Sequence, residues 1–359
     1  MKKSKHIVFT GGGSAGHVTP NVALIPTFQK KGWKVSYIGS PHGLEKSIIE
    51  PLGVSYYTVY SGKFRRYFSL KNIADLFWIF YGILQAFFLI KRLKPSIVFS
   101  KGGYVAFPVV TASWLNRVPV ISHESDLSPG LANRLAFPFL TRLCVTFPET
   151  QRYFKKSNKI MITGTPIREA LFQGKSDKGK ALCGFPDNHK PILLVLGGGL
   201  GSVVLNETIY TALSHLLIFY NIIHVCGKGK KSDVRIETPG YIQFEFLYDT
   251  LPDILAYSDV ILSRAGLNTI YELVSLRKTH LLVPLPSSSS RGDQILNAHF
   301  FLKKRCSRVI DERNLNTENL LYELNALYKE RDRYIEEMKK WDFQKAAESI
   351  VKIIEEHII

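Results

Sequence analysis

Two glycine-rich turns, each directly after a short apolar run, are the segments of this chain best suited to chemistry. The first is HIVFTGGGSAGH at residues 6–17, and the second is ILLVLGGGLGS at residues 192–202. A strand that ends in consecutive glycines and continues into a helix presents backbone N–H groups and the positive end of the helix dipole, which together hold phosphate. Because this unit occurs twice, we expect two tandem Rossmann-like domains that face each other across a cleft. One domain would hold a nucleotide and the other its reaction partner.

The first turn matches the dinucleotide pattern G-x-G-x-x-G, with Gly16 as its last glycine. In NAD enzymes an acidic residue follows about 20 positions later and holds the ribose hydroxyls. No Asp or Glu occurs between Gly16 and Glu45, so the sequence disfavours a dehydrogenase. His17 follows instead, in the first turn of a helix expected to end at Gly32. The helix dipole there favours a neutral imidazole that can act as a base, although His17 could also merely cap or pack.

Two further polar segments in the first half follow predicted strands. They are SKGGYVAFPV at residues 100–109 and HESDLSPGLANR at residues 123–134. Open α/β sheets bind ligands at the carboxyl ends of their strands, so both segments are candidate ligand loops. Glu124 and Asp126 could contact sugar hydroxyls or act as a base. The alternative for Asp126 is a turn-forming or capping role.

The second half offers two similar segments, SRAGLNTIYELVSL at residues 263–276 and SSSSRGDQILNA at residues 287–298. Glu272 could accept hydrogen bonds from both ribose hydroxyls, or it could be a surface acid of a helix. Asp293 and Gln294 are suited to reading sugar hydroxyls, and Arg291 to binding phosphate.

Short β-rich runs alternate with helical stretches along all 359 residues, which is typical of parallel α/β domains. We predict strands at residues 6–10, 34–38, 97–100, 118–123, 143–146, 159–163, 192–196, 221–225, 242–246, 260–263 and 280–283. A boundary is expected at residues 164–180, where turn formers and charges replace the strand pattern. The predicted domains are residues 1–165 and 166–340. A last helix at about residues 341–357 is expected to pack back on the first domain.

Charge and apolar patterning suggest an anionic membrane surface as a partner. Residues 1–170 contain 23 Lys and Arg against seven Asp and Glu, which is +16 of the total formal charge of +17. The apolar run LFWIFYGILQAFFLI spans residues 76–90. Three Lys and Arg residues follow it directly in the sequence, and four precede it at a greater distance. It is short for a membrane-spanning helix, so it is either a buried core helix or a surface element that enters the bilayer interface.

Other classes of function lack support. No helix-turn-helix, RNA-binding aromatic motif or zinc finger occurs, so no nucleic-acid partner is expected. The four cysteines are scattered and the N-terminus lacks the apolar stretch of a signal peptide, so we expect reduced thiols and a cytoplasmic protein. Neither a DxD motif nor a metal-ligand cluster is present. We therefore expect no metal and no cofactor.

The chain resembles the family of peptidoglycan N-acetylglucosaminyltransferases that use UDP-N-acetylglucosamine (UDP-GlcNAc) and undecaprenyl-diphospho-muramoyl-pentapeptide, converting lipid I into lipid II. The resemblance is carried by an ordered series of motifs: GGGSAGHVTPNVAL, KGGYVAFPV, HESDLSPGLANR, GTPIR, LGGGLGSVVLNE, SRAGLNTIYE and SRGDQILNA. It implies the GT-B glycosyltransferase fold, inversion at the anomeric carbon and no metal. It also implies peripheral association with the cytoplasmic face of the inner membrane, where the polyprenyl-linked acceptor is presented.

The resemblance also implies which residues form the site. His17 would face the acceptor, and the base that deprotonates the acceptor hydroxyl would be either His17 or a carboxylate of the 124–126 segment, Glu124 or Asp126. Substrate-binding positions in the first domain would be Ser14, Ala15, Gly16, Tyr104 and Asn133. Those in the second domain would be Arg168, near the nucleotide, and Gly199, Leu200, Gly201, Ser202, Leu247, Arg264, Gly266, Leu267, Asn268, Thr269, Glu272, Asp293 and Gln294.

Three positions depart from the commonest family pattern. Ser14 and Ala15 stand where a Thr-Gly pair is commoner, and Asp126 stands where many members have Asn. Gly199 replaces a usual serine, which leaves phosphate to backbone N–H groups and Ser202. Three other functions share features of this chain: a transferase of the same fold acting on diacylglycerol, a nucleotide-sugar epimerase, and a non-enzymatic nucleotide-sugar sensor at the membrane.

Overall fold

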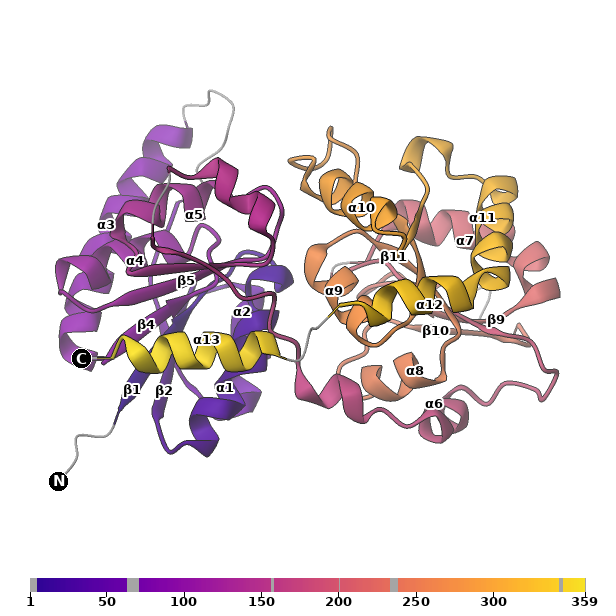
Figure 1. Ribbon diagram of the computed structural model, residues 1–359, viewed down its shortest axis with the longest axis horizontal. Helices are drawn as coiled ribbons and strands as arrows, with labels where there is room; N and C mark the ends of the chain where they lie inside the picture. Colours follow the sequence, from indigo (N-terminus) through magenta and orange to yellow (C-terminus); the bar gives the residue numbers. More distant parts are fainter. Residues whose placement is uncertain are drawn as a thin grey trace. The chain divides into compact units, whose positions relative to one another are not determined.

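The computed structural model describes residues 5–62, 71–155, 158–199, 201–232, 238–341 and 345–358. The chain divides into two compact units, of which the first is Met1–Arg168 with Phe343–Ile359 and the second is Glu169–Asp342. Each unit contains one parallel β-sheet with helices packed against it (Figure 1). The predicted α/β class with two Rossmann-like domains is therefore confirmed.

The sheet of unit 1 has seven parallel strands in the order β3-β2-β1-β4-β5-β6-β7. They are β1 (His6–Thr10), β2 (Lys34–Gly39), β3 (Ser55–Thr58), β4 (Ile97–Ser100), β5 (Val120–Glu124), β6 (Arg142–Val145) and β7 (Ile160–Ile162). The connecting helices are α1 (Thr19–Lys30), α2 (Leu44–Ile49), α3 (Lys71–Leu93), α4 (Ala106–Leu115) and α5 (Leu131–Ala136). The strand order reverses its direction between β1 and β4, and the loops after these two strands lie at the same edge of the sheet, where such folds bind ligands.

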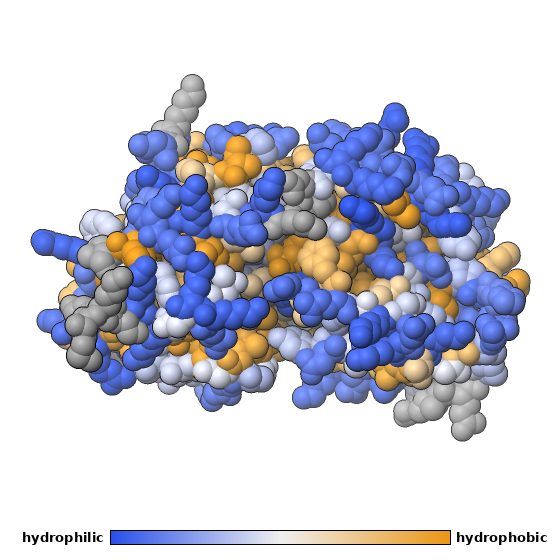
Figure 2. Space-filling model, turned by 60° about the horizontal axis from the view of Figure 1, so that its bottom comes forward, coloured by the Kyte–Doolittle hydropathy of each residue, from blue (hydrophilic) through white to orange (hydrophobic). Residues whose placement is uncertain are grey.

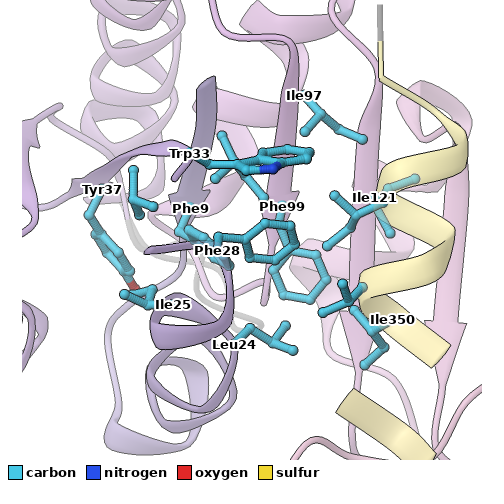
Figure 3. Close-up of a cluster of buried hydrophobic side chains, with 14 of the residues drawn as sticks. Phe9, Leu24, Ile25, Phe28, Trp33, Tyr37, Ile97, Phe99, Ile121 and Ile350 are labelled. Atoms are coloured by element: carbon cyan, nitrogen blue, oxygen red, sulfur yellow. The ribbon is translucent and has the colours of Figure 1, made fainter. Parts of the chain in front are cut away.

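Unit 1 has one hydrophobic cluster on each face of its sheet. Along β1, Ile7 and Phe9 belong to one cluster and Val8 to the other, because successive side chains of a strand point to opposite faces. In the first cluster Phe9 contacts both Phe28 and Phe99, with ring centroids 5.9 and 5.6 Å away (Figure 3).

The C-terminal helix α13 (Lys345–Glu356) completes this first cluster, although it is separated in sequence from the rest of unit 1. Its buried side chains are Ala346, Ile350, Val351, Ile353 and Ile354. Figure 3 shows Ile350 of this helix beside the aromatic side chains of the sheet and α1. Unit 1 is therefore built from both ends of the chain.

The sheet of unit 2 has six parallel strands in the order β10-β9-β8-β11-β12-β13. They are β8 (Ile192–Leu196), β9 (Asn221–Val225), β10 (Tyr241–Phe244), β11 (Val260–Arg264), β12 (Thr279–Val283) and β13 (Arg308–Val309). Its helices are α6 (Ser176–Cys183), α7 (Val203–Phe219), α8 (Leu251–Tyr257), α9 (Leu267–Ser275), α10 (Asp293–Lys303), α11 (Thr317–Lys329) and α12 (Arg331–Lys339). Here the order reverses between β8 and β11.

All eleven predicted strands match observed ones to within two residues at each end. The strand predicted at residues 118–123 begins at Val120, because Val118 donates its N–H to Ser113 and Pro119 has no N–H to donate. Two edge strands, β3 and β13, were not predicted. The final helix is α13 at Lys345–Glu356 rather than residues 341–357, and residues 342–344 lie outside the described part.

Helix α3 contains the apolar run and extends beyond it at both ends. Its segment Asp75–Leu93 is long and apolar enough to cross a membrane by length and composition. Ala86 and Ile90 are buried in the second cluster of unit 1, whereas Phe77 and Phe88 are 64% and 66% exposed. The alternative of a fully buried core helix is therefore wrong.

Exposed hydrophobic side chains also occur elsewhere on the molecule. On the face shown in Figure 2, they form separate groups among more numerous hydrophilic side chains. Helix α3 differs in the number of large hydrophobic side chains that a single helix exposes. These are Leu76, Phe77, Trp78, Phe80, Tyr81, Leu84 and Phe88.

Candidate active site

The candidate residues of unit 1 lie in loops that follow β1, β4 and β5 at the carboxyl edge of the sheet. Strands β1 and β4 are hydrogen-bonded neighbours, and β5 lies next to β4. The loops after β1 and β4 touch. A Cβ atom on Gly103 would lie 2.2 Å from the carbonyl oxygen of Gly12 and 3.1 Å from Nδ1 of His17. Glycine at position 103, where φ is +82°, is what permits this approach.

His17 lies in a separate 3₁₀ turn, Ala15–His17, and not in the first turn of the long helix as predicted. Helix α1 begins two residues later at Thr19 and has a proline in its first turn. It ends at Lys30, before Gly32. Ser14 Oγ and His17 Nδ1 are 2.9 Å apart. This hydrogen bond orients the imidazole, so the Ser14 side chain fixes the ring.

Tyr104 lies against the first glycine loop. A Cβ atom on Gly13 would be 2.4 Å from its ring. Partial burial and the nearby carboxyl group of Glu45 raise the pKa of the Tyr104 hydroxyl, so this group is a neutral hydrogen-bonding group at physiological pH. Tyr104 thus lies against Gly13, the residue before Ser14.

Glu124, at the end of β5, is buried and uses both carboxylate oxygens within the protein. Oε1 accepts a hydrogen bond from the N–H of Asp126, and Oε2 accepts bonds from the N–H of Gly130 and from Nδ2 of Asn133. The distances are 3.0, 2.9 and 2.9 Å. Asn133 is itself buried and also accepts a bond from Ser122 Oγ. Glu124 and Asn133 thus organise the loop that carries Asp126, which is itself partly exposed.

The remaining candidates of unit 1 lie at its surface or its end. Ser14 and Gly16 are exposed, and Ala15 is partly exposed. Arg168 is half-buried and is the last residue of unit 1 before the chain enters unit 2.

Glu45 was not predicted as a site residue. This residue of α2 is completely buried beneath the first glycine loop. Its carboxylate accepts hydrogen bonds from the N–H and Oγ of Ser40, at 2.9 and 2.6 Å, and from the N–H of Gly13, at 3.4 Å. The only signal in the sequence was that acidic residues are scarce in unit 1, so that each of them is a candidate for a specific role.

In unit 2 the second glycine-rich turn follows β8 and leads into α7. Ser202 is the N-cap of this helix and accepts a hydrogen bond from the N–H of Leu205. Gly201 has a φ of +71° and lies so close to β9 that a Cβ atom would be 2.1 Å from the carbonyl oxygen of Cys226. Gly199 is exposed, and Leu200 lies outside the described residues.

Arg264, at the end of β11, connects this turn to neighbouring strands. It is buried and donates from Nη2 to Ser202 Oγ at 2.6 Å and from Nη1 to the carbonyl of Val283 at 3.2 Å. Nη2 also lies 2.5 Å from a carboxylate oxygen of Glu312. Glu312 was not predicted, because it lies 48 residues further along the chain and only the fold brings it to Arg264.

The other predicted residues of unit 2 surround the starts of α9 and α10. Gly266 caps α9, where Leu267 is buried and Asn268, Thr269 and Glu272 are partly exposed. At α10, Gln294 accepts a hydrogen bond from the N–H of Leu285 at 3.1 Å, and Asp293 lies 3.4 Å from Arg291. Leu247 is buried after β10. The described residues contain no group of three or more His, Cys, Asp and Glu suited to a metal ion.

Two parallel-sheet units, each with a glycine-rich loop where its strand order reverses, define a two-domain enzyme architecture that binds nucleotides. Family models agree with this class. The N-terminal domain of glycosyltransferase family 28 matches residues 7–145, and the C-terminal domain of the same family matches residues 192–354. The chain belongs to glycosyltransferase family 28.

A protein of Clostridium novyi (strain NT) is 50% identical over 357 residues, which is 99% of both chains. It is named UDP-N-acetylglucosamine--N-acetylmuramyl-(pentapeptide) pyrophosphoryl-undecaprenol N-acetylglucosamine transferase. The resemblance noted in the sequence is thereby confirmed.

Solved structures share the fold at lower identity. MurG of Acinetobacter baumannii superimposes with a TM-score of 0.75 at 24% identity, covering 98% of this chain and 99% of that one. A UDP-GlcNAc 2-epimerase from Neisseria meningitidis, bound to UDP-GlcNAc, gives 0.70 at 16% identity, covering 98% and 100%. The fold is therefore common to transferases and epimerases, and the sequence decides between these classes.

Proposed function

We propose that this protein transfers N-acetylglucosamine from UDP-GlcNAc to undecaprenyl-diphospho-muramoyl-pentapeptide, converting lipid I into lipid II. One observation carries the proposal, namely 50% identity along essentially the whole length of a relative named for this reaction. The aligned 357 residues span both glycine-rich turns and every loop of the candidate site. An epimerase shares only the fold, at 16% identity.

Unit 2 is the donor domain in this proposal. The N–H groups of the turn at residues 197–202 and the N-terminal end of α7 stabilise the diphosphate of UDP, whose negative charge grows as it leaves. Glu272 accepts hydrogen bonds from the ribose, and Gln294 contacts the sugar. Arg264 supports this turn. Because it is buried and bonded to Ser202 and Glu312, it holds the turn in shape.

Unit 1 is the acceptor domain. His17 accepts the proton of the acceptor hydroxyl as the oxygen attacks the anomeric carbon, the bond to UDP breaks, and the configuration inverts. Asp126 and Tyr104 contact the acceptor sugar. Glu124 positions the loop that carries Asp126, since its two oxygens already accept three hydrogen bonds within the protein. Positioning of the two substrates and stabilisation of the departing diphosphate then supply most of the catalysis.

We also propose that unit 1 binds the cytoplasmic face of the inner membrane peripherally. One side of α3 presents seven large hydrophobic residues to solvent, and Lys91, Arg92 and Lys94 at and beyond its end are exposed. Apolar side chains enter the interface while cations meet anionic headgroups. Because the other side of α3 packs in the core of unit 1, the helix lies on the membrane and does not cross it.

The test is direct assay of purified protein. With UDP-GlcNAc and a short-chain lipid I analogue, we expect stoichiometric UDP and a disaccharide product detected by mass spectrometry. Diacylglycerol serves as an alternative acceptor in a parallel reaction, and UDP-GlcNAc alone reports epimerisation by NMR. A product in either of those reactions but not with lipid I would overturn the proposal. Absence of product in all three would favour a nucleotide-sugar sensor.

A further inference from the structure

The first glycine loop rests on a carboxylate that nothing in the proposed mechanism uses. Glu45 has no solvent exposure, and unit 1 has few acidic residues. An ionised side chain is buried at large cost unless hydrogen bonds compensate, so a buried carboxylate held by specific donors indicates a defined role.

The backbone around Glu45 is built to admit it. Cβ atoms on Gly12 and Gly43 would lie 2.6 and 2.2 Å from its carboxylate oxygens, so a larger residue at either position would displace the Glu45 carboxylate. Ser40 supplies two hydrogen bonds to Oε1. Oε2 remains for the N–H of Gly13, in the loop itself.

The contact with Gly13 leads directly to the candidate base. Gly13 precedes Ser14, whose hydroxyl lies 2.9 Å from Nδ1 of His17. The ring of Tyr104 packs on Gly13 from the loop after β4. A displaced Gly13 would therefore shift both the hydroxyl that orients His17 and the tyrosine beside it.

We propose that Glu45 is a positioning residue of the acceptor-side site: by accepting the N–H of Gly13 it fixes the loop that lets Ser14 orient the His17 imidazole. The catalytic consequence rests on the proposed function, because it assumes that His17 is the base. The effect of Glu45 on the orientation of His17 is independent of the proposed function, because the hydrogen bonds involved are all within the protein.

The main variant is Glu45→Gln, which keeps the size of the side chain but gives it one acceptor oxygen in place of two. Its NH₂ group must then face either Ser40 or Gly13, both of which donate. We expect kcat to fall about tenfold or more, since small displacements of catalytic groups cost up to about 100-fold. The KM for the lipid I analogue should rise several-fold, and the KM for UDP-GlcNAc should change less than twofold.

Two further variants separate positioning from general stability. Ser40→Ala removes one bond to Oε1 but leaves the Gly13 contact, so kcat should stay within about threefold of wild type. Glu50→Gln, on an exposed acid just after α2, is the matched control and should change nothing. If Glu45→Gln does not fold, Glu45→Asp keeps the charge and withdraws the carboxylate from Gly13, and the same losses are expected.

A measurement without substrate distinguishes this proposal from the proposed function. In full-length protein labelled with ¹⁵N-histidine, the ring nitrogen shifts of His17, assigned with His17→Ala, report its tautomer and hydrogen bonding. We expect these shifts to move in Glu45→Gln and not in Glu50→Gln. Unchanged His17 shifts in Glu45→Gln, or an unchanged kcat, would overturn the positioning role. Moved shifts in a protein without transferase activity would leave it standing while the proposed function fails.

Discussion

His17 and Glu124 show how the setting of a side chain decides its role. Both follow strands at the carboxyl edge of the same sheet. Glu124 is buried and accepts three hydrogen bonds from its own loop, whereas His17 is partly exposed and its ring is hydrogen-bonded to Ser14. A carboxylate with its oxygens engaged is suited to holding a loop, and an oriented imidazole is suited to taking a proton.

Replacing His17 with alanine should lower turnover by about 10²-fold or more, the usual range for a general base. The affinity for UDP should stay within a few-fold, because the donor loops belong to unit 2. Steady-state kinetics with UDP-GlcNAc and the lipid I analogue, together with UDP titration, measure both quantities. Asp126→Asn is the comparison variant. If turnover stays at the wild-type level in His17→Ala but falls in Asp126→Asn, the base is Asp126.

Buried histidines should make unit 2 sensitive to acid. Burial lowers the pKa of His224 and of His280 to about 4, from a usual value of 6.5. Between these values the unfolded chain binds protons that the folded chain does not, so stability is complete above pH 6.5 and falls as the pH drops towards 4. Each histidine contributes a slope of up to about 1.4 kcal/mol per pH unit.

The check is urea unfolding of the full chain between about pH 4.5 and about pH 7.5, followed by a probe in unit 2. His224→Gln removes one titrating group, and the slope of unfolding free energy against pH should fall by about one proton. The exposed His299 provides a control as His299→Gln, which should leave the slope as it is. Equal slopes in all three proteins would show that His224 is not neutral in the folded state.

At the scale of elements, the sequence predicted best where strands are buried on both faces. Strands β1, β4, β8 and β9 were predicted to the residue because each is a continuous run of mostly apolar side chains bounded by glycine, proline or polar residues. Strand β3 (SYYT) lies at the sheet edge and is only partly buried, so its pattern is weak. Glu45 and Glu312 act through contacts that only tertiary structure creates.

Helix α3 should bind anionic membranes through its exposed side. Phe77→Ser, Trp78→Ser and Phe80→Ser together remove large exposed side chains, so the protein should stay folded, keep UDP-GlcNAc affinity and bind liposomes more weakly. Liposome sedimentation at rising salt measures this, with each surface Lys or Arg worth about 1 kcal/mol.

The matched control lies on α7 of unit 2, where Ile218 and Phe219 are also exposed. Ile218→Ser with Phe219→Ser should not change liposome binding. If the α3 variant unfolds, its exposed side contributes to stability and not to membrane binding. Equal binding to neutral and anionic liposomes would show that charge is not involved, and the excess of cations in unit 1 would need another partner.

At the scale of the whole molecule, unit 1 cannot be cut from the chain at the unit boundary without loss. The chain leaves unit 1 at Arg168, forms unit 2 and returns as α13. Four buried branched aliphatic side chains of α13, from Ile350 to Ile354, pack in the cluster that also contains Phe28 and Phe99. Burial of one such side chain contributes about 1.5–3 kcal/mol, so the four contribute roughly 6–12 kcal/mol, comparable to the net stability of a domain.

We therefore expect a fragment of residues 1–168 to be unfolded or aggregated, because it leaves the surface under α13 uncovered. The same fragment joined by a flexible glycine-serine linker to residues 343–359 should be soluble and should unfold cooperatively. A fused segment carrying Ile350→Asp and Ile354→Asp is the control, since it keeps the length and removes the apolar contact. Circular dichroism and size-exclusion chromatography compare the three proteins. A stable, monomeric 1–168 fragment would show that α13 covers the sheet without being needed for its folding.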